Sequence, residues 1–282
     1  MSARELVNEQ ILINNTHVIY CFCFCPDSLN LIYSIDKMSG YDNSPLFLWR
    51  YLGIVAVLCA VSREEFCGPL SELRMQNITW LGSHARHHEE VIEEIMHHVP
   101  VLPTRFGTLF SSLDKLQELL TKHYSTITDF FTRLANNQEW AVKGFLNRQK
   151  AQEHFFSLLL QRQQEKLSSL SKGIRYFHEQ QIRIQVDKEL GYWLKQIYLT
   201  LANRLNNCTV NFRERKILSR DIYGKNMDMT LNWAFLVKPE AIREFHACIS
   251  ETHTQCAQQG LAFELSGPWP PYSFVPSLEI ET

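Results

Sequence analysis

Apolar runs and stretches with a helical repeat alternate along the first half of the chain. Residues 17–25 (HVIYCFCFC) are apolar almost throughout and are followed by Pro26-Asp27-Ser28, so they predict a buried strand that ends there. Residues 47–62 (FLWRYLGIVAVLCAVS) predict a second strand, rich in Val and Leu.

Two helices are predicted after these strands. From Trp80 to His98 the apolar residues recur at helical spacing, and the glutamates fall mostly outside that stripe. Residues 99–110 (VPVLPTRFGTLF) then read as extended and apolar. A second helix, capped by Ser111 or Ser112, is predicted to run to about Asn136.

The second half predicts strands and helices in the order β-α-β-β-α-β, which is the ferredoxin-like order. Its long first helical stretch has polar residues and Gly173 in its middle, which predicts a break there. The predicted elements are a strand at 139–146, a helical stretch at about 149–206, strands at 208–215 and 227–237, a helix from Pro239 to about Gly260, and a strand at 261–267.

These elements predict an α+β protein with two domains. Residues 1–136 form the predicted N-terminal α+β domain. Residues 137–266 form a ferredoxin-like domain with an extended helical insertion, and residues 267–282 form an extended tail rich in proline and aromatic residues.

Composition and charge narrow the possible function. The 282 residues carry a formal net charge of −2, which gives no reason to expect binding to nucleic acid or to an anionic membrane. The longest uncharged apolar run, Leu52 to Val61, is too short to span a bilayer, which needs about 20 residues. The N-terminal residues lack a secretory signal pattern, so a cytoplasmic protein with reduced cysteines is expected.

Three of the eight cysteines alternate with phenylalanine at residues 21–25. On a regular strand Cys21, Cys23 and Cys25 would share one face, about 6.6 Å apart, which is at the long end for a disulfide. A buried core strand is therefore favoured over a metal or redox site.

The histidines between His84 and His98 are the main candidates for metal chemistry. His84 and His88 are four residues apart on one predicted helix face, so with a nearby glutamate they offer possible zinc ligands. A solvated polar face is the favoured interpretation, and we predict no metal, no cofactor and no catalytic residue. The turn Arg105-Phe106-Gly107-Thr108 is either an anion-binding turn or, as favoured, a structural one.

The segment 267–274 (GPWPPYSF) combines three prolines with three aromatic residues. Proline lacks the N–H that a central strand needs, and it favours a stiff, extended backbone. Two interpretations stay open: a tail folded back over its own domains, or a preformed strip that docks on another protein.

Several of these segments together resemble the gas vesicle accessory proteins of the F and L type. The resemblance runs from about Val55 to Phe274, and it is carried most specifically by P-x-R-F-G-T and G-P-W-P-P-Y-S-F. Residues 26–50 look like an inserted or diverged loop. The matching segments are VLPTRFGTLF (101–110), EWAVKGF (139–145), NWAFLV (232–237), GPWPPYSF (267–274), WLGSHARHHEEV (80–91) and KGIRYF (172–177).

The resemblance implies a non-enzymatic assembly factor or minor structural component of gas vesicles. Its implied partners are the small hydrophobic shell protein (GvpA type) and other gas vesicle accessory proteins. Exposed aromatic residues and arginine dominate binding energy at interfaces, so the predicted contact residues are Arg105, Phe106, Trp269, Tyr272 and Phe274. Two rival hypotheses are a metal-dependent enzyme using His84–His98 and a small-ligand regulatory module.

Overall fold

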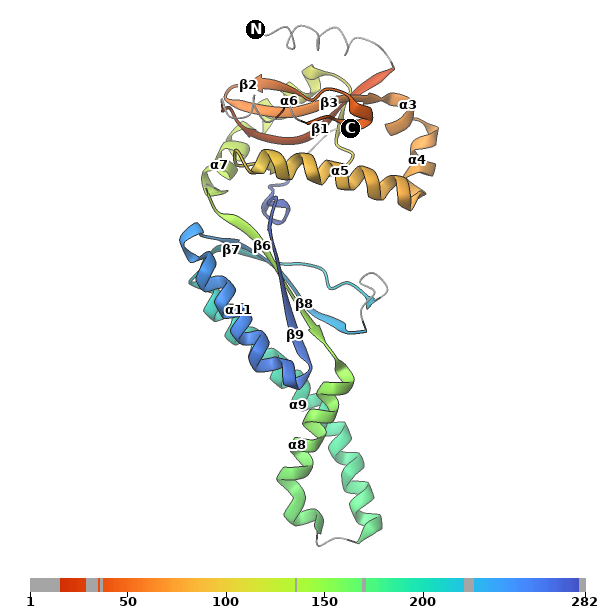
Figure 1. Ribbon diagram of the computed structural model, residues 1–282, viewed down its shortest axis with the longest axis vertical. Coiled ribbons are helices and arrows are strands. Elements are labelled where there is room, and N and C mark those ends of the chain that lie inside the picture. Colours follow the sequence, from red (N-terminus) through yellow and green to blue (C-terminus); the bar gives the residue numbers. More distant parts are fainter. Residues whose placement is uncertain are drawn as a thin grey trace. The chain divides into compact units, whose positions relative to one another are not determined.

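The computed structural model is α+β, with two antiparallel sheets, and it divides into two compact units (Figure 1). Unit 1 comprises Met1–Asn136 together with Trp269–Thr282, and unit 2 comprises Asn137–Pro268. The chain therefore leaves unit 1 and returns to it near its C-terminus. The structure describes residues 16–28, 35, 38–134, 136–168, 171–220 and 226–278.

The sheet of unit 1 is built around strand β1 (His17–Pro26), which is buried along almost its whole length. On one side β1 pairs with β3 (Ile54–Ser62), and β3 pairs with the outer strand β2 (Phe47–Tyr51). On its other side β1 pairs with two short strands, β4 (Leu102–Pro103) and β5 (Leu109–Phe110). Because all of these pairs are antiparallel, short connections suffice between β2 and β3.

The segment 47–62, predicted as one strand, is two strands joined by a tight turn, so that prediction is wrong. Leu52 and Gly53 both adopt positive φ, 48° and 80°. Two such residues in a row form the turn that matches the twist of an antiparallel hairpin. Leucine rarely adopts this conformation, so the local sequence does not predict the turn.

The predicted alternation of Cys21, Cys23 and Cys25 on one face is also wrong. The register of β1 against β3 shifts between Cys21 and Cys23, so Phe22 is an extra residue in the ladder. After this bulge the alternation is inverted, and Cys23 and Cys25 share a core cluster with Phe22.

Helix α5 (Ile78–Met96) packs its apolar residues against β1, and Asn77 caps it by accepting hydrogen bonds from two backbone N–H groups. The predicted helix from Ser111 or Ser112 to Asn136 is instead two helices, α6 (Leu113–Lys122) and α7 (Tyr124–Leu134). Ser112 caps α6 as predicted. Two short helices, α3 (Arg63–Phe66) and α4 (Pro69–Gln76), precede α5.

The sheet of unit 2 consists of β6 (Gln138–Leu146), β7 (Thr209–Glu214), β8 (Asp228–Val237) and β9 (Leu261–Trp269). Its strand order is β7-β8-β6-β9. Helices α8 and α9 form a long hairpin that projects beyond this sheet, and α11 packs against α9 (Figure 1). Strand β9 lies at a sheet edge, which is where a strand tolerates Pro268. Helices α8, α9 and α11 span Arg148–Ser168, Lys172–Asn206 and Ile242–Cys256.

Candidate functional site

Tyr20 of β1 is a fully buried tyrosine whose hydroxyl joins segments that are far apart in the sequence. The hydroxyl lies 2.9 Å from Nδ1 of His88 in α5 and accepts a hydrogen bond from the backbone N–H of Gly107 at 3.0 Å. The hydroxyl of Tyr41 lies 3.3 Å away. We call Tyr20, Tyr41, His88, Thr104 and Gly107 the Tyr20 network.

His88 holds one tautomer in this network. Its Nε2 lies 3.2 Å from the carbonyl oxygen of Thr104, which can only accept, so Nε2 carries the proton. Nδ1 then accepts from the Tyr20 hydroxyl. Burial lowers the pKa of His88 to about 4, so the ring is neutral at neutral pH. Burial likewise raises the pKa of Tyr20, which keeps its hydroxyl protonated.

The segment Thr104–Thr108 is a closed structural turn. The Thr104 hydroxyl lies 2.6 Å from the Cys21 carbonyl oxygen and 2.9 Å from that of Phe22, and these two acceptors share its single proton. The Thr108 hydroxyl donates to the Arg105 carbonyl oxygen at 2.7 Å. The amide of Gly107 is bound by Tyr20, and helix α6 begins only at Leu113. This geometry agrees with the structural interpretation of the turn and not with anion binding.

The C-terminal segment packs on the core of unit 1 through Tyr272. Pro270 and Pro271 are buried, and the Tyr272 ring packs against the same core cluster as Tyr20. The Tyr272 hydroxyl donates to Oε2 of Glu89 at 3.0 Å, next to His88 in α5. Burial raises the pKa of Glu89, and the Tyr272 hydrogen bond partly offsets this effect.

Replacing Tyr272 with phenylalanine is expected to lower the free energy of unfolding of unit 1 by about 1 kcal/mol. The substitution removes the donor to the half-buried carboxylate of Glu89 and leaves the ring packing in place. Urea denaturation measures this loss. Tyr124→Phe, at an exposed tyrosine of α7, is the control. Equal stability of the two variants would contradict the assigned hydrogen bond.

The five predicted contact residues all lie in unit 1 but differ in exposure. Arg105 and Trp269 are exposed, whereas Phe106, Tyr272 and Phe274 are partly buried. The Phe106 ring contacts the rings of Tyr20 and His88, with centroids 6.3 Å and 5.9 Å away. Phe106 and Tyr272 thus take part in the packing of unit 1.

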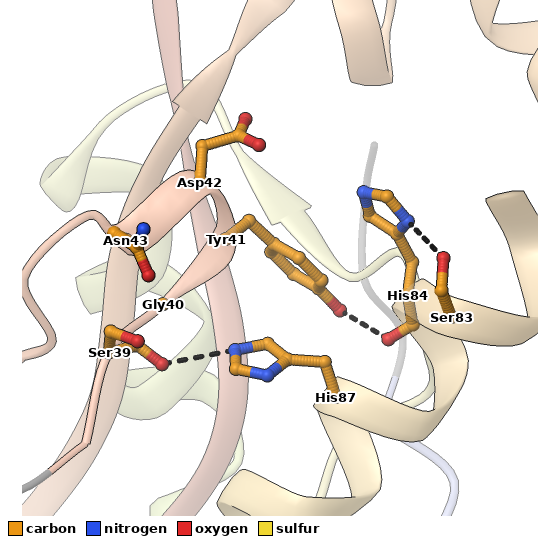
Figure 2. A pocket seen from close by; sticks show the side chains of 8 residues that line it. All are labelled: Ser39, Gly40, Tyr41, Asp42, Asn43, Ser83, His84 and His87. Atoms are coloured by element: carbon orange, nitrogen blue, oxygen red, sulfur yellow. Dashed lines mark hydrogen bonds between the residues drawn. The ribbon is translucent and has the colours of Figure 1, made fainter.

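Beside the Tyr20 network, unit 1 has a surface pocket of about 250 Å³ between the 3-10 turn η1 (Tyr41–Asn43) and α5 (Figure 2). We call it the η1–α5 pocket. The Tyr41 hydroxyl donates to the His84 carbonyl oxygen at 3.0 Å, which ties the loop to the helix. The pocket is lined by Ser39, Gly40, Tyr41, Asp42, Asn43, Ser83, His84 and His87.

Unit 2 has its own buried polar cluster. The side chain of Glu139 in β6 has no exposed surface and forms an ion pair with Arg215, which follows β7. The Arg215 backbone N–H donates to the Asn232 carbonyl oxygen at 2.8 Å, and the Asn232 amide donates to the Lys216 carbonyl oxygen at 2.8 Å. The segments EWAVKGF and NWAFLV therefore meet in this cluster.

Within the described ranges, no three His, Cys, Asp or Glu side chains are grouped so as to hold a metal ion. His84 and His88 do not converge: His88 is buried in the Tyr20 network and His84 lines the pocket. All eight cysteines lie in described residues, and each is a free thiol. Nowhere in the described part of the chain is a helix long and apolar enough to cross a membrane.

Tyr20, Tyr41 and the η1–α5 pocket do not stand out in the sequence as functional motifs. Residues 26–50, which look like an inserted or diverged loop in the sequence, supply five of the eight residues that line the pocket, Tyr41 among them. A polar side chain within an apolar strand, such as Tyr20 in HVIYCFCFC, is a usable signal, because a buried hydroxyl needs a hydrogen-bond partner.

The α+β fold of this chain is shared with gas vesicle proteins of known structure. The crystal structure of GvpF from Anabaena sp. PCC7120 matches with a TM-score of 0.66 and 18% identity, over 95% of this chain and 99% of that one. GvpF from Microcystis aeruginosa matches with a TM-score of 0.63 and 18% identity, over 92% and 99% of the two chains. At this identity the likeness shows the fold.

The sequence comparisons narrow this class to one family. Gas vesicle protein L of Streptomyces sp. (strain CB03234) is 25% identical over 263 residues, which cover 88% of this chain and 93% of that protein. The sequence model of the family "Gas vesicle synthesis protein GvpL/GvpF" matches residues 18–276. The chain belongs to this family, which confirms the resemblance and implies a role in gas vesicle formation.

Proposed function

We propose that this protein is a non-enzymatic assembly factor or minor structural component that binds the small hydrophobic shell protein (GvpA type) and supports vesicle nucleation. It would act at the gas vesicle and in the cytoplasm, together with other gas vesicle accessory proteins. Membership of the family supports the general role. The observation that carries the binding proposal is a row of exposed apolar side chains along α9.

These side chains lie on one face of the helix. At 3.6 residues per turn they fall within a sector of about 80° and extend over roughly 38 Å. Gln181, Lys188 and Lys195 occupy the same sector, so the apolar side chains are interspersed with one neutral polar and two basic residues. We call this surface the α9 stripe; it comprises Ile174, Phe177, Ile184, Tyr192 and Leu199, which are 49–70% exposed.

An exposed apolar row of this length favours a partner with an apolar surface. Helix α9 already buries Ile182, Val186 and Leu190 on its opposite face. The α9 stripe is therefore not needed for the core of unit 2. Exposed apolar surface rimmed by polar residues typically marks an interaction site. A shell subunit with an apolar face would be kept from aggregating by such a cover.

Replacing Phe177 and Ile184 together with glutamine is expected to weaken shell-protein binding roughly tenfold or more, because each buried side chain is worth about 1.5–3 kcal/mol. Glutamine keeps the helix, since its helix propensity matches or exceeds that of the residues replaced. Light scattering of the shell protein diluted from denaturant, with increasing amounts of each variant, measures the effect.

The matched control is Tyr176→Gln with Leu52→Gln. Tyr176 lies on α9 outside the stripe and Leu52 lies in a turn of unit 1, and both are about as exposed as the residues tested. The control pair is expected to suppress aggregation as the unaltered protein does. Equal loss in both pairs, or none in either, would overturn the α9 stripe as the binding surface.

The contact residues predicted from the sequence are given different roles here, because they differ in exposure. We assign Arg105 and Trp269, which are exposed, to a second contact with gas vesicle proteins. Phe106, Tyr272 and Phe274, which are partly buried, would support that contact by holding the neighbouring backbone in place. The element order of unit 2 and its strand order support a ferredoxin-like module elaborated by the α8–α9 hairpin.

A further inference from the structure

We propose that the η1–α5 pocket of unit 1 binds an arginine side chain presented by a partner protein. The pocket lies in unit 1 and the α9 stripe in unit 2, so this inference does not depend on the proposed binding of the shell protein. It rests on the rigidity of the pocket walls, on the acceptors among the lining residues, and on the size of the pocket.

The loop that forms one wall is held in place by the core. Gly40 is pressed against β3 so closely that a Cβ atom there would lie 2.6 Å from Cβ of Cys59. The Gly40 backbone N–H donates to the Ser44 carbonyl oxygen at 2.7 Å, and the buried Tyr41 ring anchors the turn. The pocket is therefore preformed, and binding costs little ordering entropy.

Helix α5 forms the opposite wall with two histidines. The His84 ring is stacked between the rings of Trp80 and Tyr41, at centroid distances of 3.9 Å and 5.1 Å. Its Nδ1 donates to the Trp80 carbonyl oxygen at 2.9 Å, so in the neutral ring Nε2 is an acceptor. His87 is fixed by a hydrogen bond of 3.0 Å from its Nε2 to the Ser39 carbonyl oxygen.

The groups that remain available in the pocket are acceptors. Asp42 is exposed and has no ion pair within the described residues, and Nε2 of His84 has no partner there either. In Figure 2 the Asp42 carboxylate and this ring nitrogen lie on the same side of the Tyr41 ring, one carried by the loop and the other by α5. A planar guanidinium, with five N–H donors and a positive charge, can satisfy a carboxylate and an imidazole nitrogen together.

The chemistry of the lining disfavours other ligands. The eight lining residues include one acidic side chain and no lysine or arginine, so an anion would meet repulsion. A metal ion is disfavoured because Nε2 of His87 is bound to the Ser39 carbonyl oxygen and its Nδ1 lies 4.0 Å from Oε2 of Glu90, so the two histidines do not offer paired nitrogens to one ion. At about 250 Å³ the pocket lies below the usual ~300–1,000 Å³ of small-molecule sites but suffices for one side chain.

Titration with Nα-acetyl-arginine amide tests the proposal, with the ring proton signals of His84 followed by NMR at neutral pH and assigned through His84→Gln. We expect a saturable shift with a dissociation constant of about 1 mM, as befits a single side chain. The citrulline analogue, a neutral isostere, is expected to bind at least about fivefold more weakly, because it lacks the charge that Asp42 attracts.

Variants of the full chain provide the controls. Asp42→Asn is expected to abolish the arginine shift without unfolding the loop, because asparagine tolerates the positive φ of 51° at this position. Glu94→Gln removes a carboxylate of α5 that pairs with His97 and His98, outside the pocket lining, and is expected to leave the shift unchanged. The proposal is overturned if the citrulline or lysine analogue binds as well as the arginine one, if Asp42→Asn retains the shift, or if ZnCl2 alone saturates the His84 signals.

Discussion

Replacing Arg215 with alanine is expected to lower the free energy of unfolding of unit 2 by about 3 kcal/mol. The carboxylate of Glu139 has no exposed surface and forms an ion pair with Arg215. Removing one member of a buried pair leaves a charge in a low-dielectric interior, which typically costs about 3–5 kcal/mol. The lower end applies because the Arg215 side chain is 30% exposed. Urea denaturation at neutral pH measures the loss.

Two further variants separate charge burial from other effects. Arg213→Ala removes an exposed arginine from β7 itself and is expected to change stability by less than about 0.5 kcal/mol. Adding Glu139→Gln to Arg215→Ala removes the buried charge and is expected to restore part of the stability. Equal effects of Arg215→Ala and Arg213→Ala would show that the ion pair does not stabilise unit 2.

Lowering the pH from about 6.5 to about 4 is expected to destabilise unit 1 by about 3 kcal/mol through His88 alone. Burial holds the pKa of His88 at about 4, against 6.5 when exposed. Between these values the unfolded chain binds a proton that the folded chain does not. The folded state therefore carries no penalty from His88 above pH 6.5. The free energy of unfolding falls as the pH drops from 6.5 to about 4, and His88 causes no further change below pH 4.

Comparison with His88→Gln isolates this contribution from the other titrating groups. Glutamine can donate to Thr104 and accept from Tyr20, as the neutral ring does, but it does not titrate. The stability difference between the two proteins is expected to shrink by about 3 kcal/mol across the window. His97→Gln, at the exposed C-cap of α5, is the control substitution. A slope unchanged in His88→Gln would contradict the neutral, buried assignment.

Elements with long, regular patterns were predictable from the sequence. Helix α5 and strands β6 and β8 lie where their apolar patterns place them, because burial of one face decides both pattern and structure. The turn at Leu52-Gly53 and the break between α6 and α7 at His123 were not predictable. Strand pairing and helix packing override local preference at such positions.

The candidate site was predictable only in its pieces. The histidine-rich helix and the P-T-R-F-G-T turn are recognisable as motifs. The residue that hydrogen-bonds to both is Tyr20, which lies 68 residues from His88 in the sequence. The bond between Tyr272 and Glu89 joins residues 183 positions apart. No periodicity encodes such pairings, since they depend on how the elements pack.

The return of the chain to unit 1 at Trp269 has a consequence for biosynthesis. A ribosome releases the N-terminus first, and contiguous domains fold as they emerge. Unit 1 is not contiguous: Trp269–Thr282 belongs to it, and Tyr272, which packs on its core, is made only after all of unit 2. The first unit to be translated is thus the last to be completed. A nascent chain that stalls after unit 2 presents a unit 1 whose surface at Glu89 is still uncovered.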